Sequence, residues 1–231
     1  MGVCMNNAKY ASWFSFAAGT LLITMLAISL KVGVTQQDFE FVKPAAVYRD
    51  GLLHFATPLR MILSFDNLFI VAYVLGTFFF CRVLREANSD GSLLKATLTM
   101  VISGGLLDLA ENLHILAMLS GAEQGILPTD NQIALQATCS AVKWHLAYAA
   151  FLVIGVAMRP RSGVEKLFAF SLIALQMPIG ILVYTVSGKE LSQVLQIARY
   201  ANLLAGFFLI AWLTGRMSAR QKLRFKDQSN G

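Results

Sequence analysis

Charged residues are scarce in this chain of 231 residues. They make up 14% of it, while hydrophobic residues make up 56%. A soluble domain carries about 25% charged residues. The shortage of charge excludes an ordinary soluble domain and, with the long apolar runs, favours an integral membrane protein.

Cysteine and catalytic motifs are also sparse. The three cysteines, Cys4, Cys81 and Cys139, lie far apart and form no CxxC or CxxCH pattern. This spacing argues against a disulfide framework and against a covalently attached haem. No P-loop, GxGxxG, GxSxG, HExxH or HxxxH pattern occurs. The sequence therefore indicates no enzyme class and predicts no cofactor.

Six stretches of the chain are apolar over about 20 residues, the length that a helix needs to cross the membrane core. We predict an all-α bundle of six transmembrane helices that forms a single domain over residues 1–215, followed by a basic tail over 216–231. The stretch 45–58, within the longest loop, predicts a short interfacial helix. The six predicted spans are residues 11–30, 59–81, 94–119, 134–158, 166–186 and 194–214.

Basic residues alternate between successive loops. They occur between spans two and three, between spans four and five, and in the tail, whereas residues 120–136 contain no lysine or arginine. By the positive-inside rule both termini are cytoplasmic, although loop 31–58 is an exception with basic and acidic residues. The net charge of +6 then points to lipid rather than nucleic acid. The expected location is the cell membrane, or the inner membrane for a bacterial source.

Polar residues from four predicted spans reach one depth. At about 1.5 Å per residue, they lie about 12–16 Å below the outer boundary, near the middle of the membrane core. By helical spacing, Asn112 shares the face of Asp108 and Glu111, and Tyr73 shares the face of Asp66. We predict that these residues line one polar cavity that opens toward the outside. The residues at this depth are Asp66, Asp108, Glu111, Lys143 and Gln176.

Charge at this depth is costly, about 2.5–3.5 kcal/mol for each group at the bilayer centre. One lysine cannot neutralise three carboxylates, so at least one acid is expected to be protonated. We predict that Lys143 pairs with Asp108, or otherwise with Asp66. The main functional hypothesis is binding or translocation of a small polar or cationic solute or of protons at Asp66, Asp108 and Glu111. A homodimer is compatible with the small size of the chain.

Two other functions are compatible with the same residues. Asp66 and Asp108 could share a proton and activate water, as in an intramembrane hydrolase. The charged residues could instead pair with a partner protein, in which case the chain would be a non-catalytic subunit. A metal site is not expected, since Glu111 and His114 form a single Glu-x-x-His pair whereas di-iron bundles repeat it.

Two further residues carry structural expectations. Arg199 lies near the outer start of span six, where the favoured interpretation is that its side chain extends to the lipid headgroups. Steering of an anion at the cavity mouth is the alternative. Pro178 lies inside a span and predicts a kink that frees backbone carbonyls beside Gln176.

Overall fold

The computed structural model describes residues 2–87, 89–185 and 189–229, and its regular structure within these ranges is entirely helical. Six of the helical segments are long and apolar enough to cross a membrane, which confirms the predicted class and number of spans. The chain is therefore a multi-pass membrane protein, while the orientation of its termini stays a prediction. The six spans are Asn6–Val32, Ala56–Glu86, Gly91–Glu123, Asp130–Ala157, Gly163–Thr185 and Val194–Ala219.

The spans are built from seven helices. The fifth span is divided into two shorter helices, and the loop between the first two spans holds a 3₁₀ turn and a short helix. A short helix was predicted within residues 45–58 and is confirmed, while its position at the membrane interface stays a prediction. In chain order the elements are α1 (Gly2–Val32), η1 (Gln36–Phe39), α2 (Ala45–His54), α3 (Ala56–Glu86), α4 (Gly91–Glu123), α5 (Asp130–Ala157), α6 (Gly163–Ala174), α7 (Gln176–Thr185) and α8 (Lys189–Ser229).

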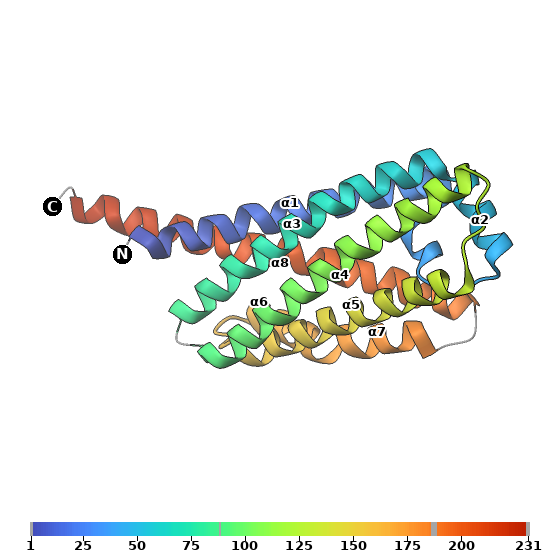
Figure 1. The fold of residues 1–231 in the computed structure, drawn as a ribbon. Coiled ribbons are helices and arrows are strands. Elements are labelled where there is room, and N and C mark those ends of the chain that lie inside the picture. The colour runs from blue at the N-terminus through green and yellow to red at the C-terminus, as the bar shows by residue number, and fades with distance from the viewer. Residues whose placement is uncertain (1, 88, 186–188, 230–231) are drawn as a thin grey trace.

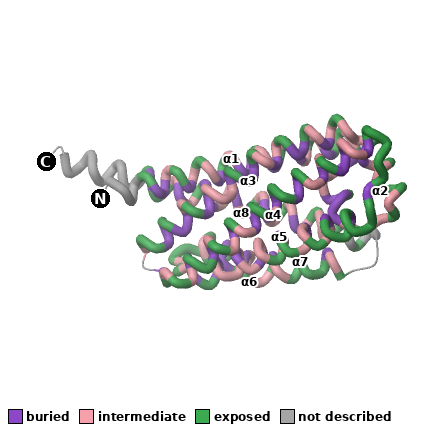
Figure 2. Tube along the Cα trace, viewed as in Figure 1, coloured by how far each residue is buried: buried purple, intermediate pink, exposed green. Residues whose placement is uncertain are grey.

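The helices form an elongated bundle (Figure 1). The start of α1 and the end of α8 lie at one end, here called the terminal end, and α2 lies at the other, here called the α2 end. Helix α1 packs against α3 and α8, α4 against α3 and α5, and α7 against α5 and α8. Figure 2 shows the buried residues on the faces that the helices turn toward one another. Helix α8 continues to Ser229, so no helix end marks the predicted tail boundary at residue 216, and this division stays a prediction.

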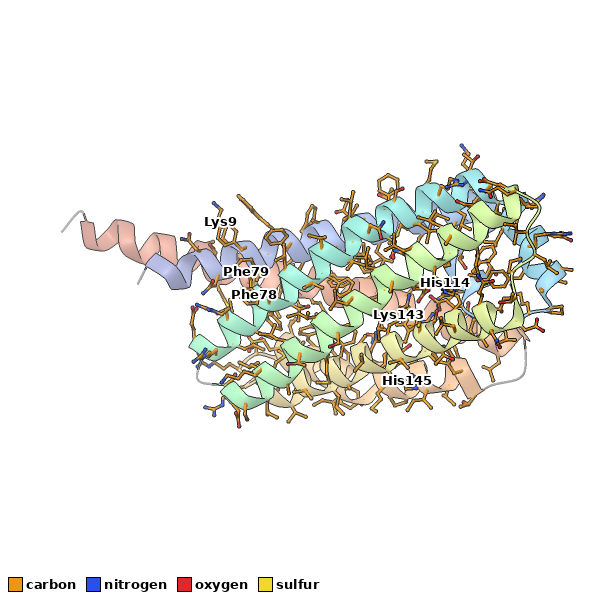
Figure 3. The ribbon with its side chains drawn as sticks, viewed as in Figure 1. Lys9, Phe78, Phe79, His114, Lys143 and His145 are labelled. Carbon is orange, nitrogen blue, oxygen red and sulfur yellow. The ribbon has the colours of Figure 1, made fainter. Side chains whose placement is uncertain are left out.

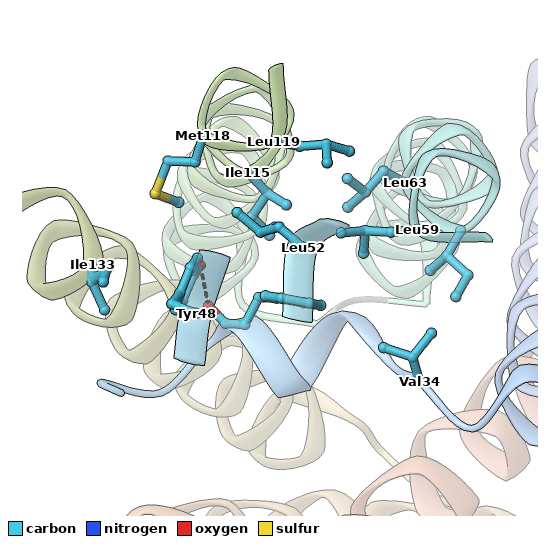
Figure 4. Packing of buried hydrophobic residues seen from close by; sticks show 11 residues of the cluster. Val34, Tyr48, Leu52, Leu59, Leu63, Ile115, Met118, Leu119 and Ile133 are labelled. Carbon is cyan, nitrogen blue, oxygen red and sulfur yellow. Dashed lines mark hydrogen bonds between the residues drawn. The ribbon is translucent and has the colours of Figure 1, made fainter. Parts of the chain in front are cut away.

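The segment that joins α1 to α2 folds back into the bundle, so part of the predicted loop 31–58 is buried, while its side of the membrane stays a prediction. A capping box begins η1, with the Thr35 backbone N–H donating to Asp38 Oδ2 over 2.8 Å. Val34 and Phe39 then pack in an apolar cluster with α2, α3, α4 and α5, which fixes the segment in place (Figure 4). This cluster consists of Val34, Phe39, Tyr48, Leu52, Leu59, Ile62, Leu63, Ile115, Met118, Leu119 and Ile133.

The fifth span is broken at Leu175, between α6 and α7. Pro178 has no backbone N–H to donate to the carbonyl of Ala174, four residues earlier, so the regular hydrogen bonding stops here. The kink predicted from Pro178 is confirmed. Beyond it, α7 approaches α5 so closely that a Cβ atom at Gly180 would overlap the ring of Tyr148. Glycine at this position therefore lets α7 pack closely against α5 at Tyr148.

Candidate ion-binding site within the bundle

Lys143 of α5 lies inside the bundle (Figure 3) and is surrounded by carboxylates. Its Nζ atom is 2.6 Å from Asp108 Oδ1, 2.8 Å from Glu111 Oε2 and 3.5 Å from Glu40 Oε1. The predicted contact between Lys143 and Asp108 is confirmed. Asp108 and Glu111 reach the lysine from one face of α4, as their i, i+3 spacing predicts.

Glu40 was missed by the sequence reasoning. It lies directly after η1, and only 2% of its surface is exposed. Its Oε2 atom accepts a hydrogen bond of 3.2 Å from the indole N–H of Trp144. From the same segment, Gln36 donates to Glu111 Oε1 over 3.2 Å and to Asn112 Oδ1 over 2.9 Å. The segment therefore closes the cluster from the α2 end and adds a fourth carboxylate to it.

Asn112 connects α4 to α3. It is fully buried, and its Nδ2 atom donates to Asp66 Oδ2 over 2.7 Å and to Asn67 Oδ1 over 2.8 Å. Asp66 thus joins the cluster through Asn112, while Asp108 pairs with Lys143.

The cluster contains four carboxyl groups and one ammonium group, all buried. None of Glu40, Asp66, Asp108, Glu111 and Lys143 is more than 9% exposed. Buried charge is stable only when it is paired, protonated or balanced by a bound ion. One lysine cannot balance the charge of four carboxylates, so protons or a cation are needed to neutralise the remaining negative charge.

Tyr48 of α2 holds the segment between α1 and α2 in place through a hydrogen bond. Its hydroxyl group donates to the Phe39 carbonyl over 3.0 Å. Burial, and then the charges of Glu111 and Glu40, raise the pKa of Tyr48 well above its ordinary value. The hydroxyl group therefore stays protonated and keeps this hydrogen bond.

Two cavities adjoin the cluster, and Asp108 and Lys143 line both of them. The first, here called the polar chamber, measures about 70 Å³ and is lined at its polar part by Ser29, Gln36 and Glu40 as well as by the pair. The second, the apolar chamber, measures about 60 Å³, and the predicted site residue Tyr73 is in its wall. The remaining wall of the apolar chamber is formed by Phe69, Thr77, Met100, Val101, Gly104, Asp108, Lys143, Trp144, Ala147, Phe151, Leu203 and Phe207.

Gln176 does not join the acids, contrary to the prediction. Its side-chain oxygen accepts a hydrogen bond from Asn202 of α8. Both residues line a third cavity of about 20 Å³, which shares Thr77 and Phe151 with the apolar chamber. Depth alone placed Gln176 with the acids. The break before α7 and the packing of α7 against α8 direct it to this neighbouring cavity.

Arg199 is fully buried, so the expected extension of its side chain to the headgroups is wrong. Its Nη1 atom donates to the Tyr148 hydroxyl group over 3.2 Å, and its Cζ atom lies 3.9 Å from the ring centroid of Trp144. Among the residues that the structure describes, its Nε and Nη2 atoms have no hydrogen-bond partner. Aromatic packing across α5 and α8 holds the guanidinium group inside the bundle.

A metal site would need His, Cys or carboxylate side chains that converge on one position. In the part of the chain that the structure describes, no three His, Cys, Asp or Glu side chains are grouped so that they could hold a metal ion. His114 lies nearer the α2 end than Lys143 (Figure 3). The geometry thus gives no support to Glu111 and His114 as metal ligands.

Comparison of the chain with protein-family models, curated proteins and solved structures gave no match. Its class therefore follows from the fold and the cluster. It is a six-span helical membrane protein with four buried carboxyl groups around one buried lysine.

Proposed function

We propose that the protein binds a small cation at the carboxylate cluster, in competition with protons, and moves it across the membrane. The carrying observation is the excess of buried carboxyl groups around Lys143. Ionisable groups inside membrane spans mark ion or substrate pathways and proton relays in other proteins. In this proposal Asp66, Asp108 and Glu111 accept the cation or the protons, and Lys143 is the internal counter-ion that the cation replaces.

The series of cavities supports movement as well as binding. The polar chamber and the apolar chamber share Asp108 and Lys143, and the third cavity continues from the apolar chamber toward Gln176. The break between α6 and α7 borders this path. Discontinuous helices beside a central binding site are a recurring feature of secondary transporters. The Asp108–Lys143 pair lines both the polar and the apolar chamber, and in this proposal it is the barrier to passage.

Binding can be tested with methylammonium and the purified protein in nanodiscs. We expect methylammonium chloride to raise the thermal unfolding temperature relative to N-methylglucamine chloride at equal ionic strength, because a ligand of the folded state stabilises it. The stabilisation should decrease from about pH 8 to about pH 6, because protons compete for the carboxylates. Equal stabilisation at both pH values, or none at either, would contradict the proposal.

A matched pair of variants makes this test specific. Asp66→Asn removes one buried carboxylate and should weaken the methylammonium effect. Asp50→Asn makes the same chemical change on α2, where the side chain is 64% exposed, and should leave the effect unchanged. An equal response of the two variants would place binding outside the cluster. Uptake of methylammonium into proteoliposomes under a pH gradient then tests transport, and uptake no faster than in empty liposomes would refute it.

A further inference from the structure

The apolar chamber continues directly from the charged groups. It shares Asp108, Lys143 and Trp144 with the polar chamber, but most of the rest of its wall consists of apolar side chains from α3, α4, α5 and α8. A hydrated inorganic cation gains little from such a wall, because transfer of an ion to largely apolar surroundings is costly. A chamber of this kind beside a carboxylate suits a molecule with one charged end and one apolar end.

We propose that the cation is a primary alkylammonium ion with a short chain of about four to six carbon atoms. Its ammonium group replaces that of Lys143 at Asp108, and its apolar chain occupies the apolar chamber. This inference rests on the proposed function, since it names the class of cation that the same site takes.

The size of the chamber sets the length of the chain. A volume of about 60 Å³ corresponds to about four water-sized positions, at about 10–15 Å³ for each. Four to six carbon atoms fill such a space, whereas methylammonium leaves it empty. From the transfer free energy of a methylene group, each added CH₂ that enters the chamber should lower the Kd about three- to fourfold.

Two small residues keep the chamber open. A Cβ atom at Gly104 would lie 3.7 Å from the Lys143 carbonyl oxygen, which is an ordinary contact. The backbone therefore accepts alanine at this position, and its methyl group would narrow the chamber. Ala147 lies one turn of α5 beyond Lys143 and is also in the wall. A leucine at position 147 would fill the chamber without changing any charged group.

The experiment compares methylammonium, butylammonium and hexylammonium by titration calorimetry with the full-length protein in nanodiscs. Butanol and butyrate have the same chain without the cation. We expect butylammonium to bind at least tenfold more tightly than methylammonium, and butanol and butyrate to bind much more weakly than butylammonium. Ala147→Leu should remove the advantage of butylammonium and leave the Kd of methylammonium within about twofold. Ala134→Leu, at an exposed position of the same helix, should change neither.

The outcomes separate this inference from the function on which it rests. Binding of methylammonium without a gain for butylammonium would overturn the alkylammonium assignment and leave the proposed function intact. No binding of any ammonium ion would overturn both. Butanol binding as tightly as butylammonium would show that the chamber takes apolar molecules independently of the cluster. Retained binding of methylammonium shows that the Ala147→Leu variant is folded. If this variant no longer binds methylammonium, Gly104→Ala is used in its place. Gly104→Ala should reduce the advantage of butylammonium over methylammonium partially.

Discussion

Lys143 and Arg199 are both buried basic residues in contact with Trp144, yet their surroundings are opposite. Lys143 lies within 4 Å of three carboxylates. Arg199 has no carboxylate within ion-pairing distance among the described residues, and its recorded contacts are a tyrosine hydroxyl group and aromatic rings. One region of the bundle thus has an excess of hydrogen-bond acceptors, and the other has N–H groups that find no acceptor within the described part of the chain.

This difference is the reason why we place the proposed cation beside Lys143 and not beside Arg199. A cation that enters beside Lys143 finds carboxylates that the lysine alone cannot neutralise. Beside Arg199 it would meet a fixed positive charge and aromatic faces. Trp144 stands between the regions, because its indole N–H donates to Glu40 and its ring lies against the arginine. The comparison therefore predicts different consequences for loss of each basic residue.

The largest effect is expected for Lys143→Met. This change leaves Asp108 and Glu111 buried without their counter-ion, and broken buried pairs cost about 3–5 kcal/mol of unfolding free energy in soluble proteins. Thermal unfolding in nanodiscs should show the loss. The double variant Lys143→Met/Asp108→Asn should recover much of it, because both members of the pair are then absent. Lys143→Met combined with Asp50→Asn should be additive, and additivity with Asp108→Asn as well would refute the pairing.

Arg199→Met should cost less, about 2 kcal/mol. The variant loses one hydrogen bond of a charged donor and the packing on Trp144, contributions of about 1.5–3 and up to about 2 kcal/mol. It also removes the desolvation penalty of a buried charge, and it leaves no carboxylate unpaired. The same unfolding measurement compares it with Lys143→Met. A loss as large as that of Lys143→Met would mean that Arg199 has a counter-ion and that the two regions are alike.

Glu40→Gln tests the carboxylate that the segment between α1 and α2 contributes. The change keeps the shape of the side chain but removes one negative charge from the wall of the polar chamber. We expect the Kd of methylammonium to rise about tenfold, equivalent to about 1.4 kcal/mol. Glu123→Gln is the matched control, because Glu123 forms an exposed ion pair with Arg60. An unchanged Kd in Glu40→Gln would show that residues of the spans alone form the site and that the segment between α1 and α2 does not contribute to it.

The fold was largely predictable from the sequence, because a membrane span has a strong signal in one dimension. About 20 apolar residues in a row marked each of the six spans. The contact between Lys143 and Asp108 was also predictable, since depth and helical spacing placed both groups at one level and on compatible faces. These arguments need only distances along regular helices.

The remaining errors share a physical cause. Glu40 lies outside the spans, so counting depth along a helix could not place it, and charged neighbours such as Asp38 and Lys43 made the segment resemble a solvated loop. The apolar residues Val34, Phe39 and Phe41 were the available signal that the segment folds inward. Arg199 was misplaced because the aromatic residues that hold it come mainly from α5 rather than from its own helix. Tertiary contacts between separate helices leave no repeating pattern in the sequence, so the spacing of residues could not predict them.

The smallest predicted effect concerns the support of the segment that carries Glu40. Tyr48→Phe removes the hydrogen bond to the Phe39 carbonyl and should lower the unfolding free energy by about 1 kcal/mol near neutral pH. The pKa of Tyr48 is raised in the folded state, so its contribution is fully present below the ordinary tyrosine pKa of about 10. It should decrease as the pH rises above about 10, because unfolding then releases a proton from the tyrosine. Thermal unfolding of both proteins from about pH 7 to about pH 11 measures the difference, which should narrow at the alkaline end. A difference that widens there would show that Tyr48 ionises in the folded protein and that the segment is not sealed from solvent.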